Sequence, residues 1–298
     1  MAPCWKSDDM RDRLDPLIAE RAAWLTAPWA APARRVLDRM LSYDRSCEIG
    51  EGLRHAPTPE LMGVLADMIA RDVEVEGIHR IPKDGAAIVV ANHPTGIADG
   101  IVLWSLVAPI RPDLFIYTNS DVLRVMPQME DLIVPVEWRE EKRTVAATRA
   151  TMAATRKALK ENRLGVIFPS GRLAKRRGLR LYERPWMHSA AALARKYDLP
   201  VIPLHIRARN SALFYLFDRI HPSLRDITLF HETLNKDRQP FRVRVGQPIA
   251  AADLPTSADD ATEILRRATL GLGDEGVGLW EMTGPPFRRP RGIVERRA

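Results

Sequence analysis

The chain has 298 residues, 46% of them hydrophobic, so it can bury a large core as one domain or as a domain with an attached helical unit. Its net charge of +7 suits polyanions, phosphate-bearing ligands or an anionic membrane surface. Two cysteines exclude a disulfide framework and indicate a reducing compartment. No apolar run reaches the roughly 18–20 residues of a spanning helix, and the first residues lack the apolar core of a secretion signal. We therefore expect a soluble or peripheral protein.

Residues 1–72 predict a small N-terminal helical unit, divided into short pieces by Pro28, Pro32, Pro57 and Pro59. Its apolar side chains stand beside arginines, a pattern that also suits a helix lying on a membrane surface. Amphipathic helices more often face a protein core. A helical pair packed on the main domain is therefore the favoured interpretation, and the membrane contact stays open as an alternative.

Residues 73–255 alternate short apolar runs with longer amphipathic segments. The predicted strands are 86–91, 114–118, 132–136, 164–168, 201–206 and 241–245. The predicted helices are 100–108, 144–161, 185–197 and 211–219. This order predicts an α/β fold with a mainly parallel β-sheet flanked by helices.

Residues 256–298 predict one helix, 259–270, followed by an end rich in glycine and proline that closes with several arginines. We expect that end to be a mobile basic tail rather than a fold element. The three predicted regions are thus 1–72, 73–255 and 256–298.

The stretch from Asn92 to Asp99 carries the strongest functional signal, because it joins a buried strand to a packed helix. Open α/β sheets place their chemistry at the carboxyl ends of strands. There His93 could act as a base near neutral pH, with Asp99 fixing its tautomer. The N–H groups of Gly96 and Ile97, at a helix start, are candidates for stabilising an oxyanion.

A second strand end follows at residues 168–172. Gly171 permits close approach of backbone to a ligand, and Arg172 opens a run of basic residues suited to phosphate. Most such charge runs are solvated loops, so Arg172 is kept as a ligand contact, and a contact from Lys175 to Arg177 stays open. The histidines outside this region show no paired metal-ligand spacing, and we expect no metal.

These segments resemble the PlsC-like glycerolipid acyltransferase superfamily, and more narrowly its bacterial hemolysin-like and ornithine-lipid-type branch. The similarity covers roughly residues 73–249. Four ordered blocks at strand ends carry it, and together they are more specific than any one alone: 77–93, 132–139, 168–172 and 201–204.

The resemblance implies an acyltransferase in which His93 is the general base and Asp99 orients it. It implies that Arg139, Ser170, Gly171 and Arg172 contact the acceptor. The acyl donor would be acyl-CoA or acyl carrier protein, with no cofactor beyond that co-substrate. The acceptor would be a lysophospholipid, 1-acylglycerol-3-phosphate-like, or an amino-lipid, with transfer to oxygen or nitrogen.

Two departures from the family pattern matter. Five residues separate His93 from Asp99 instead of four, so their pairing needs a turn, and Asp99 as a helix N-terminal charge is the alternative. Ser170 replaces a glutamate common in the family, which suggests a different acceptor head group.

The resemblance also implies a cytoplasmic location, with peripheral attachment to the inner face of the membrane. A non-catalytic protein that binds anionic lipid is the alternative function. A nucleic-acid-binding protein is suggested by charge alone, and no recognition motif supports it. We therefore expect no nucleic-acid partner.

Overall fold

The computed structural model describes residues 9–137, 143–178, 180–273 and 294–296. Within them, eight strands form one sheet and two more form a separate hairpin. In chain order the strands are β1 (Val73–Glu76), β2 (Ala87–Ala91), β3 (Phe115–Asn119), β4 (Ile133–Val136), β5 (Leu164–Ile167), β6 (Lys175–Arg177), β7 (Arg180–Tyr182), β8 (Val201–Arg207), β9 (Phe241–Val245) and β10 (Val294–Arg296).

The helices precede, separate and follow these strands. They are α1 (Met10–Arg21), α2 (Ala31–Met40), α3 (Tyr43–Leu53), α4 (Thr58–Ile69), α5 (Ile97–Val107), α6 (Asp121–Val125), α7 (Val145–Lys160), α8 (Ser189–Tyr197), α9 (Ala212–Ile220), α10 (Pro222–Ile227), α11 (Leu229–Leu234) and α12 (Ala258–Leu270). Short 3₁₀ turns stand between several of them. None of the described helices combines the length and apolarity needed to cross a bilayer.

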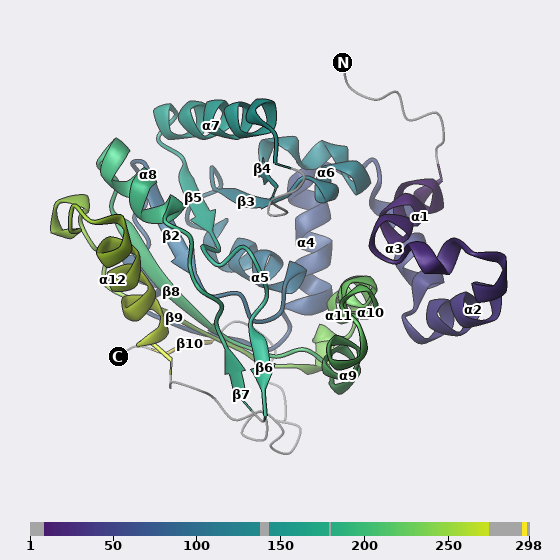
Figure 1. Cartoon of the computed structure of the whole chain (residues 1–298). Coiled ribbons are helices and arrows are strands. Elements are labelled where there is room, and N and C mark those ends of the chain that lie inside the picture. Colours follow the sequence, from purple (N-terminus) through teal and green to yellow (C-terminus); the bar gives the residue numbers. More distant parts are fainter. Residues whose placement is uncertain (1–8, 138–142, 179, 274–293, 297–298) are drawn as a thin grey trace.

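The large sheet has the order β10-β1-β9-β8-β2-β5-β3-β4, and only β8 and β9 pair antiparallel in it. Helices cover both of its faces (Figure 1). The predicted α/β class with a mainly parallel sheet is therefore confirmed. Each of the six predicted strands is present with ends within one residue of the prediction.

The central strand β2 explains why the sequence pattern was informative. Its residues are at most 1% exposed, and they divide between the two faces of the sheet. Ala87, Val89 and Ala91 belong to the core shared with α4 and α5, whereas Ile88 and Val90 belong to the core shared with α7, α8 and α12. A strand buried on both faces needs a continuous apolar run.

Three strand segments differ from the predictions. Strand β1 is a Val–Glu alternation whose acids meet arginines on β9, as Glu74 meets Arg242 at 3.1 Å. Strands β6 and β7 form a hairpin where a basic loop was expected. Residues 294–296, assigned to a tail without fold elements, pair with β1 at the sheet edge. In all three segments, pairing with a distant or neighbouring strand outweighs weak local propensity.

The N-terminal helices do not all belong to one unit. Helix α4 packs into the main core against α5. Helices α1 to α3 lie to one side (Figure 1) and pack through their own apolar clusters, one of which includes Phe217 of α9 and Ile227 of α10. These contacts agree with helices packed on the main domain. Helix α2, however, buries none of its own residues.

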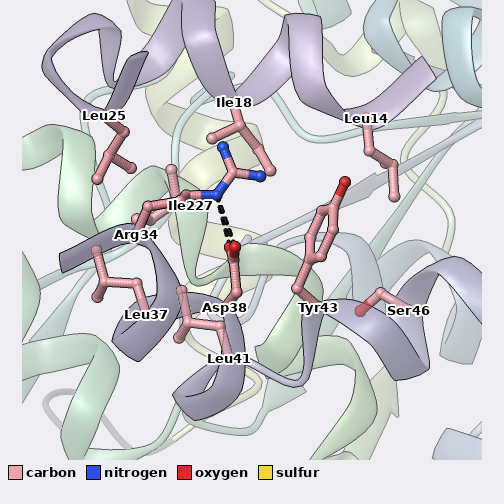
Figure 2. Close-up of a pocket in the computed structure, with 10 residues that line it drawn as sticks. All are labelled: Leu14, Ile18, Leu25, Arg34, Leu37, Asp38, Leu41, Tyr43, Ser46 and Ile227. Carbon is pink, nitrogen blue, oxygen red and sulfur yellow. Dashed lines mark hydrogen bonds and ion pairs between the residues drawn. The ribbon is translucent and has the colours of Figure 1, made fainter. Parts of the chain in front are cut away.

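A small cavity lies inside this N-terminal group, between α1, α2, α3 and α10 (Figure 2). Leucine and isoleucine side chains line most of it, with the Arg34–Asp38 ion pair on one wall. The space open to the centres of water molecules is about 30 Å³, above the roughly 10–15 Å³ that one water needs on this measure.

Candidate active site

The site is built on the turn that follows β2. Asn92, the first residue of the turn, is buried, and its side-chain amide bonds to β8. Its Nδ2 donates to the carbonyl oxygen of Ile206 at 2.8 Å, and its Oδ1 accepts from the N–H of Ile206 at 2.7 Å. These two bonds anchor the turn to the neighbouring strand. His93 consequently leaves the sheet at the edge formed by the carboxyl ends of β2, β5 and β8.

The structure brings His93 and Asp99 together. His93 Nδ1 lies 3.0 Å from Asp99 Oδ2, and the Asp99 side chain is fully buried. The distance is that of a hydrogen bond, but the alignment is not, so His93 Nδ1 has no well-directed partner here. Catalytic hydrogen bonds are often long or poorly aligned before substrate binds.

The position of Asp99 is compatible with both interpretations that the sequence left open. It stands in the first turn of α5, where its Oδ2 accepts from the N–H of Thr95 at 2.8 Å and of Gly96 at 2.9 Å. Its Oδ1 accepts from the Thr95 hydroxyl at 2.5 Å. The turn needs Gly96, whose φ of 97° disfavours other residues. This turn absorbs the additional residue between His93 and Asp99.

The imidazole of His93 is packed on one face but remains partly exposed to solvent. It stacks on Phe168, with ring centroids 4.3 Å apart, and its side chain is 19% exposed. Beside the turn, an apolar wall is formed by Leu173 and Leu229, the side chains closest to Gly96. Part of the ring therefore stays open to solvent, and two leucine side chains lie close to the turn that carries it.

The β6–β7 hairpin binds the main chain of His93 from both ends of the hairpin. Before β6, the N–H of Ala174 donates to the carbonyl oxygen of His93 at 2.9 Å. After β7, Glu183 Oε2 accepts from the N–H of His93 at 3.2 Å. Burial raises the pKa of Glu183, while the Ser170 hydroxyl, the His93 N–H and the His93 ring all oppose that rise.

The predicted substrate residues have different environments. Ser170 is buried, and its hydroxyl donates to the carbonyl oxygen of Arg172 at 2.8 Å. Gly171 adopts a φ of 58°, as a tight turn requires, and the Arg172 side chain is exposed near the site. Arg139 lies outside the described residues.

The two candidate oxyanion donors also differ. The N–H of Gly96 already donates to Asp99, so it is not available to an oxyanion. The prediction for Gly96 is therefore wrong, because the start of the helix uses this N–H internally. Ile97, the first residue of α5, stays a candidate.

Arginines gather on the hairpin side of the site. Arg184 Nε donates to the carbonyl oxygen of Leu173 at 3.2 Å, and Arg184 forms no ion pair among the described residues. Burial, followed by repulsion from Arg225 and Arg172, lowers the pKa of Arg184. Arg225 is paired with Asp218 and Asp226. Arg184 is thus a half-buried cation in a locally positive region, which favours an anionic ligand.

Sequence reasoning missed Glu183 and Arg184. They lie 90 and 91 residues after His93 and reach the site only because the hairpin folds back over the turn. Their local signal was the alternation of Leu181 and Glu183 around a basic run, which did not distinguish a hairpin from a solvated loop.

Fold and site together define an α/β protein with a histidine–carboxylate pair at the carboxyl edge of a parallel sheet, the arrangement of a general-base site. Residues 72–207, which include this pair, match the Acyltransferase family model. The match confirms, over these residues, the resemblance to acyltransferases found in the sequence.

Named relatives agree with this placement. The chain is 24% identical over 183 residues to lyso-glycine lipid O-acyltransferases of Phocaeicola vulgatus and Bacteroides thetaiotaomicron, covering 59% of this chain and 64% and 65% of those proteins. It therefore spans less than two thirds of their length. An uncharacterised protein of Mycobacterium tuberculosis is 28% identical over 215 residues, covering 63% of this chain and 55% of that protein.

Among solved structures, the chain is similar to the 1-acyl-sn-glycerophosphate (LPA) acyltransferase PlsC from Thermotoga maritima. The TM-score is 0.46 and the sequence identity is 15%, with 92% of this chain and 98% of that chain covered.

Proposed function

We propose that the protein transfers a fatty acyl group from acyl-CoA or acyl carrier protein to a hydroxyl or amine of a lysolipid acceptor. The observation that carries the proposal is the contact between His93 and the buried Asp99 at the carboxyl edge of the sheet. The acyltransferase-family match over residues 72–207 supports the reaction class. Lysolipid acceptors are supported by relatives named for acylation of lyso-glycine lipid.

In the proposed step, His93 Nε2 takes the proton of the acceptor as its oxygen or nitrogen attacks the thioester carbon. A tetrahedral intermediate forms, the carbon–sulfur bond then breaks, and the proton passes from His93 to the leaving thiolate. Asp99 stays ionised and stabilises the imidazolium through Nδ1. General-base assistance of this kind is worth about 100- to 10,000-fold in rate. Ile97 N–H is the donor candidate for the oxyanion.

The acceptor we propose carries an anionic head group. Arg172 and Arg184 supply guanidinium groups on the hairpin side, and guanidinium binds phosphate or carboxylate through paired hydrogen bonds. Arg139 is a further candidate from the family pattern. The apolar wall of Leu173 and Leu229 offers a path for hydrocarbon. A phosphate and a lipid carboxylate share this chemistry, so a panel of acceptors is needed.

We further propose peripheral attachment to the inner face of the membrane through α2 and the turn before it. Trp29, Val36 and Met40 are 73%, 59% and 45% exposed, and Arg35 and Arg39 are exposed beside them. Exposed apolar side chains flanked by cations suit an anionic lipid surface. Binding to anionic but not neutral vesicles, weakened in Trp29→Ser, would support this attachment.

The decisive experiment incubates purified protein with radiolabelled acyl-CoA or acyl carrier protein and a panel of lysolipids: lysophosphatidate, lyso-glycine lipid and lyso-ornithine lipid. We expect labelled product from the wild type and at least a 100-fold loss in His93→Ala. His188→Ala is the matched control, because His188 lies outside the site, at the start of α8.

Absence of product with every donor and acceptor would refute the acyltransferase proposal. If the wild type bound lipid without any turnover, and His93→Ala bound it equally well, the non-catalytic alternative would replace the acyltransferase proposal.

A further inference from the structure

Glu183 is a carboxylate that the proposed reaction does not yet use. It lies after β7, where Oε2 accepts from the N–H of His93 at 3.2 Å and Oε1 accepts from Trp186 Nε1 at 3.4 Å. The Ser170 hydroxyl and the His93 ring also act on it. Three elements therefore meet at this carboxylate: the turn after β2, the loop after β5 and the segment before α8.

The surroundings of Glu183 do not suit a purely stabilising role. It forms no ion pair with any cation in the described part of the chain, although Arg184 adjoins it in sequence. Its burial raises its pKa, which means that the folded protein disfavours its ionised form. Glu183 is half-buried, and an acid whose pKa is raised by folding costs some stability at neutral pH. A carboxyl group that lowers the stability of the fold and lies next to a candidate base is a candidate for a functional role.

We propose that Glu183 is a positioning residue for His93, fixing its main chain and stabilising the positive charge that its ring acquires during acyl transfer. Asp99 contacts the Nδ1 edge of the ring, while Glu183 holds the backbone of the same residue from the hairpin. Two carboxylates then act on one imidazole, each from a different part of the chain. This inference rests on the proposed acyltransferase function.

The contact with Ser170 suggests where the second carboxylate comes from. The family commonly places a glutamate at the position of Ser170, and here that side chain is short and buried. Glu183 approaches from the hairpin, and Ser170 lowers the pKa of Glu183, while the Ser170 hydroxyl donates its hydrogen bond to Arg172. The sequence has a neutral hydroxyl at this position, and the hairpin brings the carboxyl group of Glu183 to the same side of His93. Exchanging the two residues should therefore preserve function better than changing either one.

The test compares four purified proteins: wild type, Glu183→Gln, Ser170→Glu and the exchange variant Ser170→Glu/Glu183→Ser. Glutamine keeps the size of the side chain and one acceptor oxygen but removes the charge. We expect Glu183→Gln to lower kcat about 10- to 100-fold, the usual loss for a bond to a charged group, with the donor KM changed less than about threefold. Ser170→Glu, which crowds two carboxylates, should also be slow. The exchange variant should recover at least a tenth of the wild-type kcat.

Glu161→Gln is the matched control, because Glu161 is exposed at the end of α7. Circular dichroism and thermal unfolding confirm that each variant folds, and Glu183→Ala, which also removes the charge, replaces Glu183→Gln if that variant does not fold. Wild-type kcat in Glu183→Gln, or an exchange variant no faster than Ser170→Glu, would overturn the proposal. In either case activity in the wild type and its loss in His93→Ala would leave the acyltransferase assignment standing. An inactive wild type would overturn both.

Discussion

Replacing Asp99 by asparagine tests the central pair most directly, because the substitution keeps the shape of the side chain. Asp99 accepts three hydrogen bonds at 2.5 to 2.9 Å, two at Oδ2 and one at Oδ1. Asparagine can keep the bonds at one oxygen, and the Thr95 hydroxyl can turn to accept from the new amide. Bonds to a charged group are worth about 1.5–3 kcal/mol each and neutral ones about 1 kcal/mol. We expect a loss of about 2–4 kcal/mol in unfolding free energy.

That loss leaves the protein folded if its stability lies in the usual range of about 5–15 kcal/mol. The effect on catalysis should be larger, since the neutral amide no longer stabilises the imidazolium. We expect kcat to fall about 100- to 10,000-fold with little change in acceptor KM. The assay is initial-rate transfer of labelled acyl group, run beside urea unfolding of the same preparation.

Thr95→Ser serves as the control, because it keeps the hydroxyl that donates to Asp99. A folded Asp99→Asn protein that retains more than a tenth of the wild-type kcat would show that Asp99 serves only to stabilise the first turn of helix α5. The electrostatic role assigned to the pair would then be wrong.

Three further predictions concern stability and head-group binding. Lys236→Met should cost about 3–5 kcal/mol in urea unfolding, because it leaves Glu232 charged and buried without its partner at 2.9 Å, and Lys236→Met/Glu232→Gln should recover part of this. Glu183→Gln should raise the unfolding free energy at pH 7, because the pKa of Glu183 is raised in the folded state and the wild type therefore loses stability as pH rises from about 4.5 through the folded pKa. Below that range the unfolding free energies of the two proteins should converge, and a difference that is constant with pH would contradict this prediction. Arg184→Leu should raise the acceptor KM about 10-fold or more while leaving donor KM unchanged, and equal changes in both would argue against head-group binding.

Features that depend on residues close together in the sequence were predictable, whereas those that depend on residues far apart were not. Strand β2 and the histidine that follows it were predictable, because a strand buried on both faces requires a continuous apolar run, here five residues long. The proximity of Asp99 was predictable as well, since the turn is local and Gly96 permits it. The hairpin was not, because its arginines and lysine match a solvated loop as well as a strand pair.

Glu183 marks the limit of that reasoning. Its role depends on the fold of a segment 90 residues away from His93, and its own neighbours in sequence are a tyrosine and an arginine. The Gly96 oxyanion prediction failed for the opposite reason. The sequence placed the Gly96 N–H correctly at the start of the helix, but this N–H donates to the carboxylate of Asp99 instead of pointing toward a ligand.

Both backbone groups of His93 are bound by residues that flank the β6–β7 hairpin. Exchange of the His93 amide proton with solvent requires that its hydrogen bond to the Glu183 side chain opens, so the exchange rate reports how often this contact is broken. Any molecule that clamps the hairpin would slow that exchange and immobilise the imidazole in the same event. Ligand binding at the arginines and ordering of His93 would then be coupled, and hydrogen exchange followed by mass spectrometry could measure this coupling without any turnover.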